Sequence, residues 1–231
     1  MATQTSNKRG FTLLDTLPDF DFTASDGSEN SLHGYFKGSW GLLFSHPDDF
    51  TPICTTELGE AARLQNVGEF EKRGVKLLGL SCNSVESHQK WIQDIEAYSG
   101  EKVQYPIIAD VKRTIAAELG MLAQDDLDKA GLPLTVRTVF VLDPEVRIRL
   151  TLTYPASTGR NFNELLRVID SLQLTENQKL ATPVNWQKGD PVVVAPTLSA
   201  EDAQAKYSDL EIKELPSGKA YLRFTSQAKH A

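Results

Sequence analysis

Cysteine is scarce in this chain of 231 residues, which contains only Cys54 and Cys82. Two cysteines are too few for a disulfide framework in a protein of this length. They form no Cys-x-x-Cys pair, which disfavours a thioredoxin-type disulfide reductase. The low number instead suits a reducing compartment, in which a reactive thiol can be regenerated.

The sequence also lacks long apolar runs and any excess of positive charge. No run approaches the ~18 residues that a membrane-spanning helix needs, and the segment before Asp15 has no apolar centre typical of a secretory signal. The formal net charge is −7, so neither nucleic acid nor an anionic membrane surface is an expected partner. We therefore expect a cytoplasmic protein without an integral membrane segment, with an organelle or the nucleus left open.

The most informative stretch runs from His46 to Glu57, after an apolar run at 40–45 that predicts a buried strand. Pro52 suits the first turn of a helix, and Thr51 suits its N-cap. Cys54 would then lie in the first turn, among unpaired backbone N–H groups at the positive end of the helix dipole. This setting favours the thiolate, the nucleophilic form of cysteine, although a small buried hydrophobic cysteine fits the same pattern.

Pro47, Thr51 and Cys54 follow the spacing Pro-x-x-x-Thr-x-x-Cys, within a longer matching run at 44–59. In these residues the sequence resembles the peroxiredoxins, and in particular their one-cysteine (peroxiredoxin-6-like) branch. The resemblance implies a thiol-dependent peroxidase that reduces hydrogen peroxide and alkyl or lipid hydroperoxides, in antioxidant defence and redox homeostasis. It also implies homodimers, with higher oligomers in some members.

The resemblance assigns the principal roles to four side chains. Cys54 would attack the peroxide, Thr51 would orient it, and Pro47 would shape the loop and shield the thiolate from water. Arg137 would supply the cation that faces the cysteine. An arginine in an otherwise apolar predicted strand needs a partner in any case, so a purely structural ion pair is the alternative for Arg137.

Supporting roles are implied for Glu57, Arg160 and His46. Glu57 matches a glutamate that braces the arginines of the family. Arg160 matches a second arginine near the site, while a solvent-facing residue at a helix start is its alternative. His46 matches a histidine that can bond the thiol or the substrate, and a packed histidine with satisfied hydrogen bonds is the alternative.

Peroxide would convert Cys54 to a sulfenic acid. Because no cysteine follows Cys82, we expect regeneration by an external thiol, such as glutathione or another small or protein reductant, with no cofactor. Cys82 ends a predicted buried strand and is interpreted as a structural thiol. We expect no metal site, because the histidines show no ligand spacing with cysteines or acids; they are His33, His46, His88 and His230.

Two other functions compete with a peroxidase. Some animal one-cysteine peroxiredoxins have phospholipase A2 activity, and Ser39 lies in a partly matching Lys-Gly-Ser-Trp-Gly context with His33 at the matching histidine position. Here Lys37 replaces a glycine and Glu145 replaces an aspartate, which weakens a lipase hypothesis, although glutamate can orient a histidine. A non-enzymatic function, as a peroxide sensor or a chaperone-like assembly, is a different class of alternative, since the same Cys54 chemistry could feed signalling.

Alternating predicted strands and helices indicate an α/β fold with a mixed central sheet. The resemblance implies a thioredoxin-like fold with a small C-terminal domain, because 181–186 and 215–219 resemble the extension of one-cysteine peroxiredoxins. We expect a flexible N-terminus at 1–10, a peroxidase domain at 11–174 and the extension at 175–231. We also expect a hairpin over 136–154, an amphipathic helix over 160–174, and a loop over 123–133.

Overall fold

The computed structural model describes residues 10–176 and 178–226, so nearly all of the expected flexible N-terminus lies outside the described residues. The chain divides into two compact units that meet in sequence between Phe162 and Asn163. This division lies at the start of helix α5 (Phe162–Glu176). The sequence placed its domain boundary at the other end of that helix, and this boundary stays a prediction.

A mixed five-stranded sheet forms the centre of the first unit, in the order β5-β4-β3-β8-β9. Three strands run parallel, and β8 and β9 complete the sheet in antiparallel pairings. The mixed α/β architecture expected from the sequence is thus confirmed, including the hairpin across Asp143. The strands are β3 (Trp40–Ser45), β4 (Val75–Ser81), β5 (Ile107–Ala109), β8 (Arg137–Leu142) and β9 (Ile148–Tyr154).

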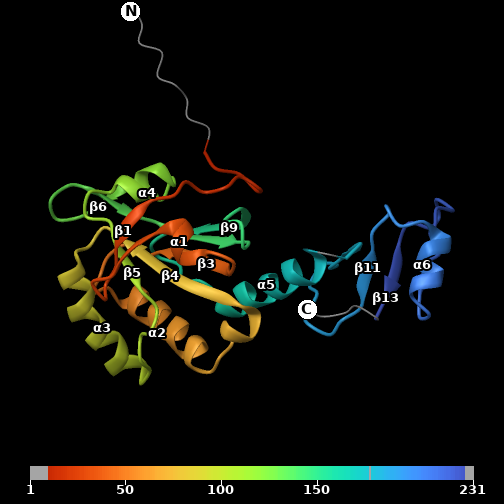
Figure 1. The fold of residues 1–231 in the computed structure, drawn as a ribbon, viewed down its shortest axis with the longest axis horizontal. Helices are drawn as coiled ribbons and strands as arrows, with labels where there is room; N and C mark the ends of the chain where they lie inside the picture. The colour runs from red at the N-terminus through yellow and green to blue at the C-terminus, as the bar shows by residue number, and fades with distance from the viewer. Residues whose placement is uncertain (1–9, 177, 227–231) are drawn as a thin grey trace, which may run out of the picture. The chain divides into compact units, whose positions relative to one another are not determined.

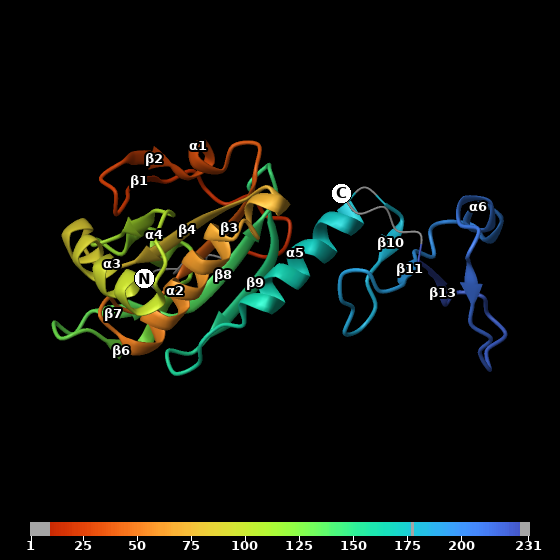
Figure 2. The same ribbon diagram turned by 90° about the horizontal axis from the view of Figure 1, so that it is seen from below.

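Helices cover both faces of this sheet (Figures 1 and 2). Neighbouring strand residues point to opposite faces, so Leu43 packs into the core beneath α1 and α4, while Phe44 faces Tyr105, at a ring separation of 5.7 Å. The face that carries Phe44 is covered by α2 (Pro52–Asn66) and α3 (Val85–Ser99). The helices of this unit are α1 (Leu32–Phe36), α2 (Pro52–Asn66), η1 (Glu71–Arg73), α3 (Val85–Ser99) and α4 (Thr114–Glu118), and a hairpin of β1 (Asp21–Thr23) and β2 (Glu29–Ser31) lies on the α1 side.

The segment expected to be a loop over 123–133 is partly a strand, so that prediction was wrong. Strand β6 (Leu122–Leu127) pairs with β7 (Pro133–Thr135) in a separate two-stranded sheet. Asp128 closes the turn between them by accepting hydrogen bonds from the backbone N–H groups of Ala130 and Leu132. The polar composition of this segment concealed the strand, because its pairing depends on a partner rather than on an apolar pattern.

The second unit consists of α5 and a small four-stranded sheet in the order β10-β11-β13-β12. Trp186 is 1% exposed in its core, together with Val192 and Val194. Strands β12 and β13 pair antiparallel at the edge of this sheet. The elements are β10 (Leu180–Ala181), β11 (Val192–Val194), α6 (Ala200–Lys206), β12 (Glu211–Ile212) and β13 (Arg223–Thr225). Across the described residues of both units, no helix has the length and apolar character to cross a bilayer.

Candidate active site

The loop between β3 and α2 delivers Cys54 to the first turn of a helix. Helix α2 begins at Pro52, with Thr51 in extended conformation at the N-cap position, as the sequence predicted. The Thr51 hydroxyl does not cap the helix, because it donates to the carbonyl of Asp48 at 2.9 Å. Phe50 turns the loop with a φ of 55°, a left-handed conformation that is uncommon for residues other than glycine. Cys54 is fully buried.

Arg137 begins strand β8 and places its guanidinium group directly on the cysteine. Its Nη1 donates to Cys54 Sγ at 3.2 Å and to Glu57 Oε2 at 2.6 Å. Its Nε and Nη2 both donate to the carbonyl oxygen of Ala156, at 3.1 and 2.6 Å. The arginine is 2% exposed, and these contacts hold it in one orientation. A cation at this distance stabilises negative charge on the sulfur.

Glu57 lies one helical turn after Cys54 and is shared between two arginines. The backbone N–H and the Nε of Arg160 donate to Glu57 Oε1 at 2.7 and 2.9 Å, and Arg160 Nη2 donates to Oε2 at 2.8 Å. Arg160 also donates to the carbonyl of Ser45 at the end of β3, at 2.8 Å. Its side chain is buried, so the solvent-facing alternative does not describe this residue.

Without the cysteine, the positive charges of the buried group of Arg137, Arg160 and Glu57 outnumber its negative charges. Arg137 and Arg160 contribute two positive charges, and Glu57 contributes one negative charge. Buried charge is costly unless it is balanced. A thiolate at Cys54 brings the group to neutrality, whereas a thiol leaves one net positive charge. Together with the helix N-terminus, this imbalance favours the ionised, nucleophilic form of the sulfur.

A cavity of about 480 Å³ opens beside this group. Pro47 and Thr51 line it from the active-site loop, and Arg137 lines it from the sheet. Arg137 therefore touches both the cavity and the sulfur. A small ligand in the cavity would meet the threonine hydroxyl and the guanidinium group together.

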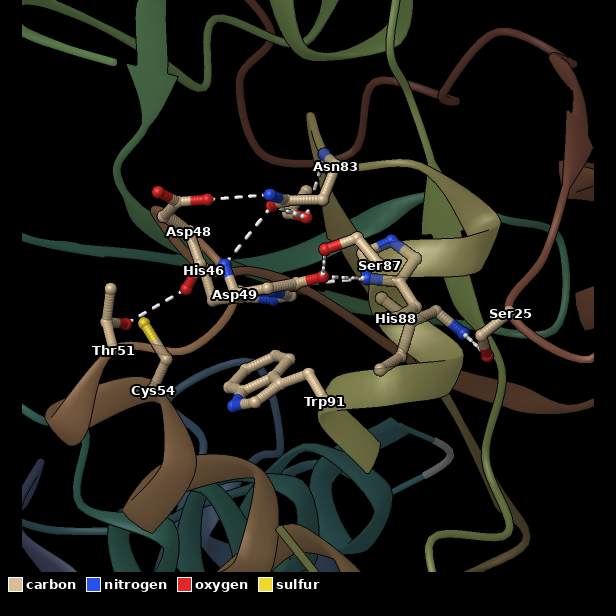
Figure 3. Close-up of polar contacts among 12 residues, drawn as sticks. Ser25, His46, Asp48, Asp49, Thr51, Cys54, Asn83, Ser87, His88 and Trp91 are labelled. Carbon is tan, nitrogen blue, oxygen red and sulfur yellow. Dashed lines mark hydrogen bonds and ion pairs between the residues drawn. The ribbon is translucent and has the colours of Figure 1, made fainter. Parts of the chain in front are cut away.

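His46 lies at the end of β3 but makes no hydrogen bond to Cys54. Its Nε2 bonds Asp49 Oδ1 at 2.9 Å, and the same carboxylate bonds His88 Nδ1 at 2.9 Å. Ser87 donates its hydroxyl to Asp49 Oδ2 at 2.7 Å. Figure 3 shows these side chains converging on Asp49, with Trp91 beside them and Cys54 on the far side of the loop. Asp49 thus joins the loop to helix α3.

Burial and hydrogen bonding act in opposite directions on the pKa values of His46 and Asp49. Burial lowers the pKa of His46 below its usual value, and the neighbouring Asp49 opposes that shift only in part. Burial alone would raise the pKa of Asp49, yet the hydrogen bonds from His46 and His88 hold it well below its usual range. The Asp49 carboxylate accepts a hydrogen bond from His46 Nε2–H, so the buried Nδ1, which has no partner among the described residues, carries a lone pair.

Asn83 ties the same loop to the end of β4. Its Nδ2 donates to Asp48 Oδ1 at 2.6 Å, and its Oδ1 accepts from the backbone N–H of Asp49 at 3.2 Å. No sequence motif indicated a role for Asn83, Asp49 or His88. One feature of the sequence could have pointed to this network: His88 lies on the apolar face of α3. A buried imidazole at that position needs a hydrogen-bond partner.

His46, Asp49 and His88 also form a cluster of potential metal ligands, with their ligand atoms within 4.8 Å of one another. The sequence predicted no metal site from histidine spacing. His46 and Asp49 lie three positions apart in the active-site loop, and His88 comes from α3. Their facing atoms hydrogen bond to each other, which accounts for the cluster without an ion. His230 lies outside the described residues.

Cys82 lies in the core on the face of the sheet covered by α1 and α4, away from the face covered by α2. Burial raises the pKa of its thiol to about 11, which keeps it protonated and unreactive at neutral pH. Both cysteines are free thiols. These features favour the interpretation of Cys82 as a structural residue.

The residues of the lipase hypothesis are not assembled into a relay. His33 directs its Nε2 to the carbonyl of Leu17 at 2.6 Å, and Glu145 pairs with Arg147 at 3.3 Å. All of these residues belong to the described chain, and no hydrogen bond connects Ser39 with His33 or with Glu145.

Sequence comparisons relate this chain to known proteins. Residues 13–151 match the model of the AhpC/TSA family, and residues 171–210 match the C-terminal domain of 1-Cys peroxiredoxin. The chain is 51% identical to peroxiredoxin-6 of Gallus gallus, over 94% of this chain and 98% of that protein. It is 47% identical to a 1-Cys peroxiredoxin of Dirofilaria immitis, over 96% and 99% of the two chains.

Solved structures give the same result. A cysteine-to-serine mutant of the peroxiredoxin 6 of Arenicola marina superposes with a TM-score of 0.91 at 49% identity, covering 95% of this chain and all of the other. A yeast mitochondrial 1-Cys peroxiredoxin, studied for its thiol resolving mechanism via glutathione and thioredoxin systems, gives 0.82 at 45% identity, with coverage of 93% and 99%.

Proposed function

This chain belongs to the one-cysteine peroxiredoxins, and from that premise we propose that Cys54 is the thiol that attacks the peroxide. The protein is a thiol-dependent peroxidase, an oxidoreductase acting on peroxides, with a thioredoxin-like fold. The contact of Arg137 Nη1 with Cys54 Sγ, at 3.2 Å inside a buried group of unbalanced positive charge, carries the assignment.

The reaction is a displacement at oxygen. The Cys54 thiolate attacks one peroxide oxygen, an S–O bond forms, and the O–O bond breaks. The leaving oxygen departs as an alkoxide or hydroxide and takes up a proton, giving an alcohol or water. Cysteine is oxidised to sulfenic acid, and the peroxide is reduced by two electrons.

The surrounding residues divide the work of this step. In our proposal Arg137 stabilises the thiolate and the charge that develops on the peroxide oxygens. Thr51 lines the cavity and orients the peroxide with its hydroxyl, which also donates to the loop at the carbonyl of Asp48. Pro47 limits the access of water at the cavity wall. Glu57 and Arg160 hold Arg137 in place, so they act as positioning residues.

His46 has a different role in this proposal. Its hydrogen bond to Asp49 anchors the start of the active-site loop, so it supports the loop rather than contacting the sulfur.

An external thiol completes the cycle. The sulfenic acid condenses with one thiol to a mixed disulfide and releases water, and a second thiol releases reduced Cys54 as the reductant leaves as a disulfide. Glutathione is the reductant that we propose, in line with the glutathione and thioredoxin systems named for the yeast relative. A cytoplasmic location and a homodimer belong to the same proposal, supported by the family.

Single-turnover oxidation tests the function. Reduced wild type, Cys54→Ser and Cys82→Ser are mixed with one equivalent of hydrogen peroxide, and the modified residue is located by mass spectrometry. We expect fast consumption with oxygen on Cys54 in the wild type and in Cys82→Ser, and no fast consumption in Cys54→Ser. A disulfide between Cys54 and Cys82, or a reactive Cys54→Ser variant, would contradict the proposal.

A further inference from the structure

The cavity beside Cys54 carries an acidic rim, which we define as Asp48, Asp125 and Asp126. All three line the same cavity as Thr51 and Arg137. Asp125 and Asp126 come from β6, within the segment whose composition predicts a loop. Its pairing with β7 brings the two aspartates to the cavity.

No cationic side chain in the described part of the chain pairs with this acidic rim. Asp125 and Asp126 are exposed and, among the described residues, have no hydrogen-bond or ion-pair partner. Asp48 accepts a hydrogen bond from the uncharged amide of Asn83 at 2.6 Å. Of the described residues that line the cavity, Arg137 alone is positively charged, and it belongs to the buried group in which Arg137 and Arg160 are balanced by Glu57 and a Cys54 thiolate.

The charges of the buried group and of the acidic rim therefore differ. The buried group of two arginines, Glu57 and the thiolate is neutral in sum, whereas the acidic rim carries three negative charges. The remaining wall is largely apolar, formed by Pro47, Pro52, Ile53, Leu127 and Leu134. An anion that enters meets repulsion at the rim without a compensating net positive charge inside.

We propose that the acidic rim sets the substrate specificity of this peroxidase, by disfavouring peroxides that carry a negative charge. Uncharged hydroperoxides enter freely, and their hydrocarbon part packs on the apolar wall. This inference rests on the proposed function, because it assumes that the peroxide reaches Cys54 through this cavity. Asp125 and Asp126 are thus specificity-determining residues that leave the bond-making step untouched.

Paired substrates test the acidic rim. Linoleic acid hydroperoxide is anionic at pH 7.5, its methyl ester is neutral, and hydrogen peroxide is small and neutral. Single-turnover oxidation of Cys54 is followed with each one, below the micelle concentration, in wild type and in the double variant Asp125→Asn, Asp126→Asn. We expect the variant to react about two- to fivefold faster with the acid at low ionic strength, and unchanged with the other two. Added salt should remove the difference, because it screens exposed charges.

A matched control removes two charges elsewhere in the same unit. Asp21 and Glu29 are exposed and line a separate cavity, so Asp21→Asn with Glu29→Gln should leave the acid-to-ester ratio of rates at its wild-type value. An unchanged ratio in the Asp125, Asp126 variant, or an equal increase in the control, would overturn the specificity proposal while the peroxidase assignment stands. Failure of wild type to consume hydrogen peroxide would overturn both.

Discussion

At the scale of single residues, the reactivity of Cys54 depends on how Glu57 divides its two oxygens between two arginines. Arg137 and Arg160 both donate to Oε2, at 2.6 and 2.8 Å, and Arg160 alone takes Oε1. This sharing orients Arg137 toward the sulfur and leaves one positive charge for the thiolate to balance. A buried pair of one arginine and one glutamate would hold the geometry but offer the sulfur no excess charge.

Replacing Arg137 tests this electrostatic contribution. We expect Arg137→Gln to slow single-turnover peroxide consumption by about 10²- to 10³-fold, because an amide lacks the charge of the guanidinium group. Arg137→Lys should lose less, since it keeps the charge but not the planar fork of donors. Stopped-flow measurement of Cys54 oxidation by hydrogen peroxide provides the rates, and circular dichroism confirms that each variant is folded.

A second arginine provides the control for this measurement. Arg63 lies on α2, the helix that carries Cys54, but its side chain is 46% exposed and pairs with Glu60 at the surface. Arg63→Gln should leave the rate within about twofold of the wild type, because exposed pairs contribute little. A folded Arg137→Gln variant as fast as Arg63→Gln would remove Arg137 from the mechanism.

At the scale of elements, Asp49 fastens the active-site loop to the end of β3 and to α3. It accepts hydrogen bonds from His46, His88 and Ser87 while being 4% exposed. Its loop also carries Pro47 and Thr51, so the network determines where the cavity wall stands. The loop gains rigidity from contacts that the reaction itself does not use.

The network makes stability depend on pH in a defined direction. The pKa of His46 is lowered from 6.5 and that of Asp49 from 3.8, so the unfolded chain binds more protons than the folded protein as the pH falls. The stabilising contribution of the network is therefore fully present above pH 6.5. It decreases as the pH falls, first through protonation of His46 and then, below about pH 4, through protonation of Asp49.

We expect Asp49→Asn to reduce the free energy of unfolding by about 3–5 kcal/mol at pH 7 and to weaken the decrease of that free energy below pH 4. Urea unfolding between pH 3 and 8 measures both effects.

Asp94 supplies the matched control, because it lies on the exposed side of α3. Asp94→Asn should change the unfolding free energy by less than about 0.5 kcal/mol and leave the acidic limb unaltered. If both variants behaved alike, the buried network would not be the source of the pH dependence.

At the scale of the whole molecule, the chain forms two units with separate cores. The atoms that contact Cys54, and the described residues that line its cavity, belong to the first unit. The second unit has its own core around Trp186, whose indole N–H donates to the carbonyl of Asp190 at 3.0 Å. We therefore expect that a substitution in the core of the second unit can lower the stability of that unit without slowing the reaction at Cys54.

Truncating Trp186 tests this separation. We expect Trp186→Ala to destabilise the second unit by about 3–5 kcal/mol, because it removes the largest side chain of a small core. The first-turnover rate with hydrogen peroxide should stay within about twofold of the wild type. Thermal unfolding and stopped-flow kinetics are compared with Val184→Ala, in which the altered side chain is 87% exposed. A large loss of rate in Trp186→Ala alone would show that the second unit contributes to the reaction.

The sequence by itself determined the local features of this protein. Pro52 and Thr51 indicated where a helix begins and placed Cys54 in its first turn, and periodicity indicated the mixed α/β architecture. These features depend on residues within a few positions of each other, through backbone geometry and the alternation of side chains. The family resemblance added Arg137, Glu57 and Arg160 as expectations, which spacing alone could not supply.

Only the tertiary structure decided which of these residues touch. Arg137 and Cys54 are 83 positions apart, and Glu57 and Arg160 are 103 apart, so no local pattern records their contact. The same holds for the bond between Asp49 and His88 and for the acidic rim, whose strand β6 exists through its pairing with β7. Contacts across such separations are set by the packing of helices on the sheet. Closing a long loop costs entropy, and the contacts formed in the core offset that cost.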